Sequence, residues 1–172
     1  ARAASGGIGS AKAAGNYAAS LLPAQIAQEQ GYDQLIWTDA KEHKYVEESG
    51  TMNLMVLKGK TLFTPPLDGK TILPGITRKS ILQLATEWGY QVKEEQILVS
   101  DLIKGIKDET IDEVFGVGTA ATIAPIKLVG FEDMQYHLSD FTKWEFSTKV
   151  KKYLEDLKTG QEIDTRNWIE KI

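Results

Sequence analysis

The chain has 172 residues, of which 20 are Lys or Arg and 24 are Asp or Glu, so its formal charge is −4. With 42% hydrophobic and 26% charged residues, it has the composition of a folded domain. This acidic balance argues against nucleic acid or membrane partners, and no apolar run approaches the roughly 20 residues of a membrane span. The lack of cysteine excludes disulfides and Cys-ligated metals. We expect a cytoplasmic protein.

The first thirty residues predict a turn followed by a helical segment. Residues 1–4 fit the end of a strand, and the glycines of residues 5–10 favour a flexible turn. Helix-forming residues run from 11 to 30, with Asn16 or Ser20 as candidate caps and Gly31 as a stop. Pro23 should either kink this helix or lie in its first turn.

The remaining chain alternates between strands and helices, which predicts one α/β domain. Strands are expected at 35–37, 44–48, 51–57, 61–63 and 90–93, and two more within 113–126. Apolar residues at helical spacing predict a helix from Thr77 to Gly89, and Ser100 opens a short one. The last predicted helix carries Phe146 and Leu157 on one face and begins at Ser139 or Asp140.

Two nucleotide-binding motifs fail on spacing, and no metal site is predicted. Lys12 stands where the third glycine of a dinucleotide fingerprint belongs, and Ala11 stands where a P-loop has glycine. His43 and His137 are far apart in weak contexts, so both are expected in turns or on the surface.

Two charged segments could carry chemistry. Lys12 lies among small residues, which let a bulky ligand approach its amine, although a solvated lysine at a helix start is the plainer interpretation. Glu47 and Glu48 are adjacent on a predicted strand, so one of them should face the interior and need a partner. The alternative is that both lie at an exposed strand end.

Two turns could hold an anion. Residues 72–78 place a Pro-Gly turn before a helix N-terminus, whose free amides and dipole favour phosphate. Residues 116–121 form a second glycine-rich turn with a hydroxyl group. Each turn could equally be a plain chain reversal. A lysine, an acid and an anion site together are what pyridoxal 5'-phosphate requires.

Taken together, these motifs closely resemble the branched-chain amino acid aminotransferases, which are pyridoxal-phosphate enzymes of fold type IV. The matching segments are residues 12–21, 48–53, 64–67, 72–78 and 113–120, in the family's order. The resemblance implies the large C-terminal domain of the D-amino-acid-aminotransferase-like fold, an α/β architecture with mixed sheets in a pseudo-barrel and surrounding helices. It implies that residues 1–172 are this single cofactor-binding domain and that the family's small N-terminal domain is absent.

The resemblance also implies roles for individual residues. Lys12 would bind the cofactor covalently and move the substrate Cα proton, Glu48 would pair with the pyridine nitrogen, and Tyr17 would hydrogen-bond the phenolic oxygen. The phosphate would be held by Ile76, Thr77 and Thr119. The substrate would meet Gly50, Thr51, Thr119 and Ala120.

The implied activity is amino transfer from leucine, isoleucine or valine to 2-oxoglutarate, in amino-acid biosynthesis, by a homodimer or larger oligomer. Because the family builds part of the substrate pocket from its N-terminal part, this chain alone is expected to be inactive. One alternative is another fold type IV enzyme, such as a D-amino-acid aminotransferase or aminodeoxychorismate lyase. The other is a truncated domain without catalytic function.

Overall fold

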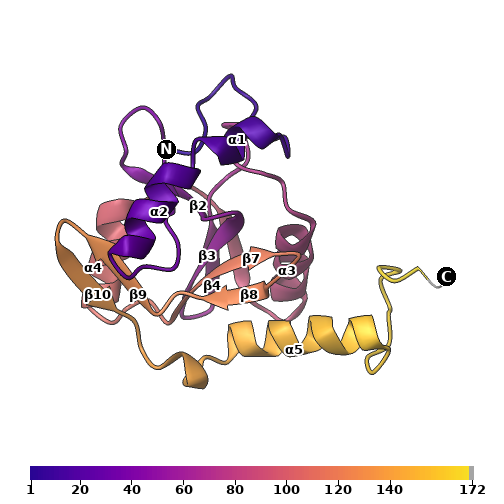
Figure 1. Ribbon diagram of the computed structural model, residues 1–172. Helices are drawn as coiled ribbons and strands as arrows, with labels where there is room; N and C mark the ends of the chain where they lie inside the picture. Colours follow the sequence, from indigo (N-terminus) through magenta and orange to yellow (C-terminus); the bar gives the residue numbers. More distant parts are fainter. Residues whose placement is uncertain (171–172) are drawn as a thin grey trace.

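A computed structural model describes residues 1–170, and its centre is an eight-stranded mixed sheet (Figure 1). The strands follow in the order β1–β2–β3–β4–β5, while β6 pairs with β2, and β7 pairs with β3 and β8. The β4–β5 pair is parallel and the other pairs are antiparallel. The eight strands are β1 (Ile36–Thr38), β2 (Tyr45–Ser49), β3 (Met52–Lys58), β4 (Thr61–Thr64), β5 (Gln91–Glu94), β6 (Ile97–Leu98), β7 (Glu113–Gly118) and β8 (Thr122–Pro125).

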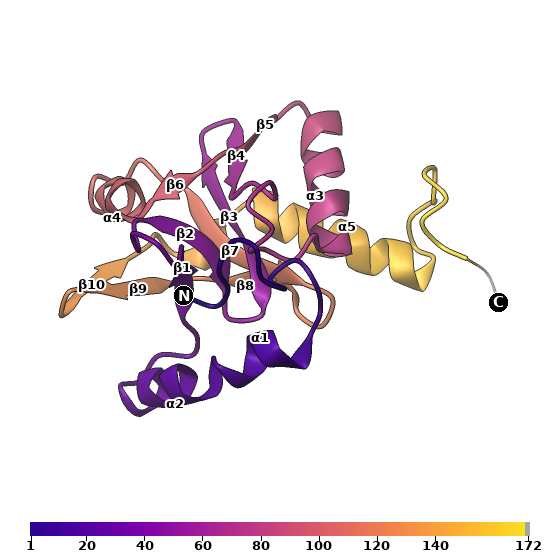
Figure 2. The same cartoon turned by 90° about the horizontal axis from the view of Figure 1, so that it is seen from above.

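A separate hairpin and the helices surround this sheet. The hairpin consists of β9 (Leu128–Phe131) and β10 (Met134–His137). The helices are α1 (Ala14–Ala18), α2 (Leu21–Glu29), α3 (Ile76–Glu87), α4 (Val99–Lys107) and α5 (Phe146–Thr159), with a 3₁₀ turn at Phe141–Lys143. Seen from above, α3 and α5 lie together, α4 lies across the sheet from them, and α1 and α2 stand apart (Figure 2). No helix within residues 1–170 combines the length and the apolar character needed to cross a bilayer.

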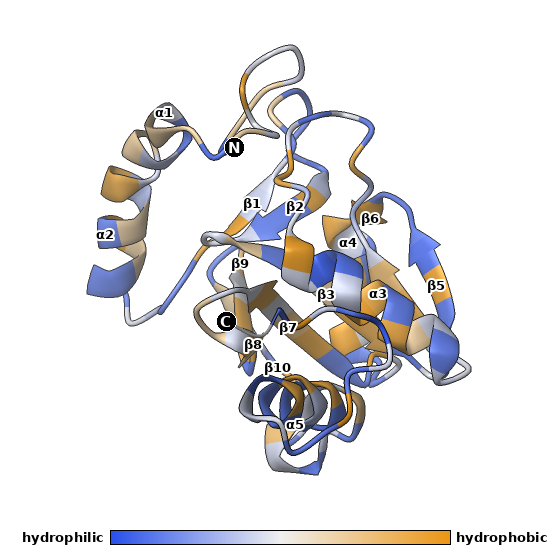
Figure 3. Ribbon diagram, turned by 90° about the vertical axis from the view of Figure 1, so that its right-hand side faces the viewer, coloured by the Kyte–Doolittle hydropathy of each residue, from blue (hydrophilic) through white to orange (hydrophobic). Residues whose placement is uncertain are grey.

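Both faces of the central strands are buried, which explains why β3 and β7 are almost continuously apolar. Met55 and Phe115 belong to one core cluster, which α3 and α5 complete. Leu54 and Val114 belong to a second cluster, which α4 and Val129 complete. Neighbouring residues of one strand therefore enter different cores. Hydropathy colouring shows apolar segments along the central strands, and α1 and α2 to one side of them (Figure 3).

The N-terminal prediction needs correction. Residues 1–4 form no strand, and the expected helix over 11–30 is two helices, α1 and α2. Pro23 lies in the first turn of α2, and Gly31 follows that helix with φ 87°. Asn16 caps nothing, because it is buried within α1 and donates to the carbonyls of Ile8 and Ala11.

Two other predicted helix starts are wrong, and the sequence patterns do not predict the β9–β10 hairpin. The α3 helix starts at Ile76 after an extended Gly75, so Thr77 lies inside its first turn. The last helix starts at Phe146, whereas Asp140 caps the preceding 3₁₀ turn. The hairpin turns at Glu132 and Asp133, whose φ values of 49° and 60° are unusual for residues other than glycine.

The start of α5 depends on Glu113, a β7 residue that is only 3% exposed. Its two carboxylate oxygens accept hydrogen bonds from the amides of Phe146 and Ser147, both at 2.8 Å. We expect Glu113→Gln to lower the free energy of unfolding by roughly 1–3 kcal/mol, because the new amide replaces one acceptor by a donor and removes charge from a helix N-terminus. Urea unfolding should show a lower midpoint with an unchanged slope. The exposed Glu155→Gln is the matched control and should leave the midpoint unchanged.

Candidate active site

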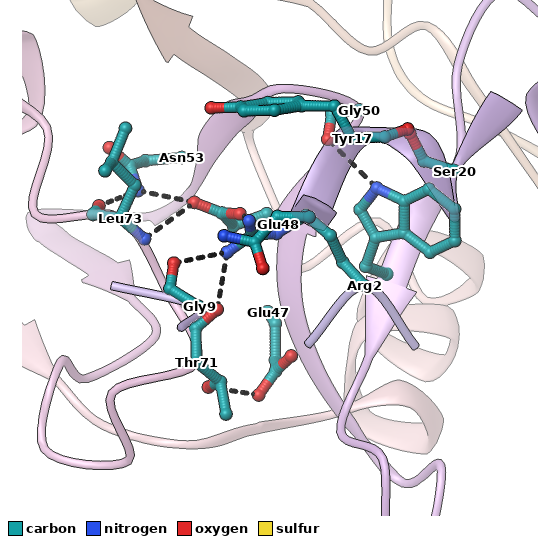
Figure 4. A network of polar contacts seen from close by, with 12 residues as sticks. Arg2, Gly9, Tyr17, Ser20, Glu47, Glu48, Gly50, Asn53, Thr71 and Leu73 are labelled. Atoms are coloured by element: carbon teal, nitrogen blue, oxygen red, sulfur yellow. Dashed lines mark hydrogen bonds and ion pairs between the residues drawn. The ribbon is translucent and has the colours of Figure 1, made fainter. Parts of the chain in front are cut away.

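A buried polar network surrounds Glu48 at the end of β2 (Figure 4). The Glu48 side chain is 4% exposed, and its Oε2 lies 2.5 Å from Nε of Arg2. Its Oε1 accepts hydrogen bonds from Nδ2 of Asn53 at 3.2 Å and from the amide of Leu73 at 3.1 Å. Asn53 lies directly opposite Glu48 in the β2–β3 ladder, so the strand register itself places these two side chains together.

The surroundings of Glu48 adjust its proton affinity to the neutral range. Burial raises the pKa of this carboxyl group from 4.5 to about 7. The positive charge of Arg2 and the Leu73 amide act in the opposite direction, and the neighbouring Glu47 adds to the rise. Glu48 is therefore a carboxyl group that can gain or lose a proton near pH 7.

Glu47 is also buried, at 8% exposure, so both members of the pair are buried where the strand pattern predicts one, and the alternative that both lie at an exposed strand end is wrong. The Thr71 hydroxyl donates to Oε1 of Glu47 at 2.5 Å. Oε2 of Glu47 is buried without a hydrogen-bond partner among residues 1–170. Burial raises the pKa of Glu47 as well.

Sequence reasoning missed Arg2, which is 8% exposed and connects three segments. Besides the ion pair with Glu48, its Nη2 donates to the carbonyls of Gly9 at 3.0 Å and Thr71 at 2.5 Å. The one available signal is the rule that a buried glutamate needs a positive partner, and that rule names no position for the partner.

The segment before Lys12 is fixed to this network through Gly9. Gly9 is buried, and a Cβ placed there would meet the backbone of Thr71, so no other residue fits without movement. Lys12 follows three residues later, before α1, and its side chain is exposed, as the solvated-lysine interpretation expects. Tyr17 lies on α1 and is half-buried, and Figure 4 draws it together with the residues of the Glu48 network.

The predicted anion-binding residues lie around one cavity. Ile76, Thr77 and Thr119 line a cavity of about 340 Å³, whose other walls are α5 and the segment with Trp168 and Ile169. Lys12, Tyr17 and Glu48 are not among the residues that line it. The α3 helix has no side-chain cap and no acidic residue in its first turn, so the amides of its first turn remain available as donors. A Cβ at Gly75 would collide with Oδ1 of Asn53, which shows how closely this helix start approaches the Glu48 network.

The residues expected to meet substrate lie in two turns at one end of the sheet. Gly50 and Thr51 connect β2 with β3, and Thr119 and Ala120 follow β7. Because β3 and β7 pair antiparallel from Asn53–Val117 onward, the start of β3 and the end of β7 lie side by side. Thr51, Thr119 and Ala120 are exposed there, while the Gly50 carbonyl accepts a hydrogen bond from the Trp37 indole at 2.9 Å.

A buried acid, a lysine-bearing loop and an uncapped helix start therefore converge at one end of a mixed α/β sheet. These groups fit an anionic pyridine cofactor, which needs a carboxylate to accept a hydrogen bond from its ring nitrogen and amides to donate to its phosphate. The site and fold thus define a protein of the pyridoxal-phosphate type. The family described as Amino-transferase class IV matches residues 9–129, and the chain belongs to this family.

Relatives and solved structures agree with that family. The chain is 41% identical over 167 residues to a probable branched-chain-amino-acid aminotransferase of Staphylococcus aureus, covering 97% of this chain and 46% of the relative. It is 38% identical to branched-chain-amino-acid aminotransferase 2 of Bacillus subtilis, covering 99% and 47%. The chain thus spans about half the length of the curated relatives it matches.

Among solved structures, the branched-chain amino acid aminotransferase from Escherichia coli superposes with a TM-score of 0.81 at 33% identity, covering 99% of this chain and 54% of that one. A T.th. branched-chain amino acid aminotransferase, solved with pyridoxamine 5'-phosphate, gives 0.82 at 26% identity, covering 99% and 52%. The expected fold class is therefore confirmed.

Proposed function

We propose that the protein containing this chain is a branched-chain amino acid aminotransferase that uses pyridoxal 5'-phosphate to move the amino group of leucine, isoleucine or valine to 2-oxoglutarate. The observation that carries this proposal is the network in which Glu48 contacts Arg2, Asn53 and Leu73. Leu73 belongs to the turn before α3, and Arg2 in turn donates to the Gly9 carbonyl in the loop before Lys12. The names of the Staphylococcus aureus and Bacillus subtilis relatives support the substrate class.

Pyridoxal phosphate, when bound, withdraws electrons from the substrate Cα and makes its proton acidic. We propose that Lys12 joins the cofactor covalently and, once released by substrate, carries that Cα proton as a general base. Glu48 would hold a proton on the ring nitrogen, and Tyr17 would donate to the phenolic oxygen. The exposed position of Lys12 leaves its amine free to approach a ligand, which supports the first of these roles.

The binding roles follow from the two turns and the helix start. We propose that Ile76, Thr77 and Thr119 hold the phosphate, because all three line the same cavity. The amides of Thr119 and Ala120 would meet the substrate carboxylate, and Gly50 and Thr51 would line the substrate side of the site. Their shared position at the end of the sheet supports this assignment.

We further propose that residues 1–172 are the cofactor-binding large domain, and that the protein acts as a homo-oligomer in the cytoplasm, in amino-acid biosynthesis. Large apolar side chains are exposed on and before α2, namely Ile8 at 55%, Leu21 at 71%, Leu22 at 66% and Ile26 at 47%. Exposed apolar side chains such as the three on α2 are typical of a surface that another polypeptide covers. Sedimentation of the complete protein should show a dimer or larger species, and a monomer would contradict this part of the proposal.

The activity is tested with the complete protein and pyridoxal phosphate. Addition of the cofactor should produce a new absorbance band, and L-leucine with 2-oxoglutarate should then yield L-glutamate. Turnover of D-alanine but not L-leucine would favour the other fold type IV enzymes. Absence of both the band and turnover would favour a domain without catalytic function.

A further inference from the structure

We propose that Arg2 is a positioning residue that fixes the Glu48 carboxylate for the cofactor ring nitrogen and couples it to the lysine-bearing loop. This inference rests on the proposed function, because it names how that site is held together. The ion pair and hydrogen bonds of Arg2 go to Glu48, Gly9 and Thr71, so Arg2 would act on the cofactor site through these groups.

The geometry gives Arg2 three simultaneous partners. Its Nε points at Oε2 of Glu48, 2.5 Å away, while its Nη2 reaches the carbonyls of Gly9 and Thr71. A planar guanidinium offers donors in a fixed fork, so one side chain can set the relative positions of all three acceptors. Lysine, with a single ammonium group on a flexible stem, cannot reproduce this arrangement.

The division of contacts on Glu48 supports the same role. Arg2 occupies Oε2, whereas Asn53 and the Leu73 amide occupy Oε1, so the carboxylate is held from both sides and cannot rotate freely. Leu73 lies in the segment that leads into α3, and Gly9 lies in the segment that leads to Lys12. The acid, the lysine loop and the approach to the phosphate cavity therefore share one set of hydrogen bonds.

The positive charge of Arg2 also favours the ionised form of Glu48. The charged groups that act on Glu48 are Arg2, which favours the ionised carboxylate, and Glu47, which opposes it. Glu47 in turn is influenced by Asp39, Arg2 and the amino group of Ala1. Burial and Glu47 both raise the pKa of Glu48, and Arg2 is the cation that lowers it. Without Arg2, Glu48 would therefore be protonated at neutral pH. A protonated carboxyl group cannot accept a proton shared with a ring nitrogen.

The first test is made without cofactor, so it does not depend on enzyme activity. The Glu48 carboxyl group is followed by ¹³C NMR during a pH titration, with Glu48→Gln used to assign its signal. We expect Arg2→Gln to move the Glu48 titration midpoint upward by roughly one pH unit or more, and Arg2→Lys to move it less because the charge remains. Arg166→Gln, which removes a different arginine–carboxylate pair, is the matched control and should not move the midpoint.

The second test uses the complete protein with pyridoxal phosphate. Arg2→Gln should weaken cofactor binding about tenfold or more and shift the pH dependence of the cofactor absorbance upward, while Arg2→Lys should recover the pH dependence but not the affinity. If both Arg2 variants keep the wild-type Glu48 midpoint, the proposal is overturned. If Arg2→Gln does not fold, Arg2→Lys alone decides, because unchanged cofactor affinity in that variant contradicts the positioning role. A wild-type protein that binds no cofactor would instead overturn the proposed function and leave the first test valid.

Discussion

Replacing Lys12 with alanine should abolish transamination by the complete protein, lowering kcat by about 10³-fold or more. The amine at this position is proposed both to hold the cofactor covalently and to carry the Cα proton, so no neighbouring group can replace it. Borohydride reduction followed by peptide mass analysis should find the cofactor attached to Lys12 in the wild-type protein. No covalent attachment is expected in Lys12→Ala.

The structure separates this chemical effect from a folding defect. Lys12 is exposed, so its truncation should leave the free energy of unfolding within roughly 0.5 kcal/mol of the wild type. Lys151→Ala, at another exposed lysine, is the matched control and should retain both activity and borohydride labelling at Lys12. Cofactor that remains covalently attached to Lys12→Ala after reduction would remove Lys12 from the mechanism.

Elements set by local periodicity can be predicted from the sequence. Strand β3 and helix α3 both lie within a few residues of their predicted positions, because alternating β-formers and an i, i+3, i+4 apolar pattern depend only on neighbours in the chain. The start of α5 differs from its predicted position, because it is set by the Glu113 carboxylate, 33 residues earlier in the sequence. The β9–β10 turn at Glu132 and Asp133 lacks the glycine or asparagine that identifies such hairpins.

Some residues of the candidate site can likewise be predicted from the sequence, whereas others are revealed only by the folded structure. Lys12 and Glu48 stand out from residue type and, above all, from the resemblance of their motifs to one family. Residue chemistry alone leaves Glu47 and Glu48 equivalent, because only the folded chain shows that Arg2 pairs with Glu48 and Thr71 with Glu47. Arg2 lies 46 positions before its partner and belongs to no motif, so its role depends on tertiary structure.

Glu48 should also make the cofactor-free protein less stable as the pH rises from about 5 to about 8. Its pKa is raised from 4.5 to about 7 by burial, so the folded chain holds a proton that the unfolded chain has already released within this window. The free energy of unfolding therefore falls with increasing pH, by about 3 kcal/mol for a shift of this size. Urea unfolding at several pH values between 5 and 8 measures the decrease directly.

Substitution of the two buried glutamates assigns that pH dependence. Glu48→Gln carries no titratable proton, so most of the slope between pH 5 and 8 should disappear, whatever the variant's absolute stability. Glu47→Gln should remove a smaller part, because the pKa of Glu47 is raised in the same direction but its carboxyl group is less deeply buried. Asp39 has a lowered pKa and so affects stability only at more acidic pH. A Glu48→Gln protein with the full wild-type slope would show that Glu48 is ionised throughout this range and that the ion pair with Arg2 outweighs the cost of burial.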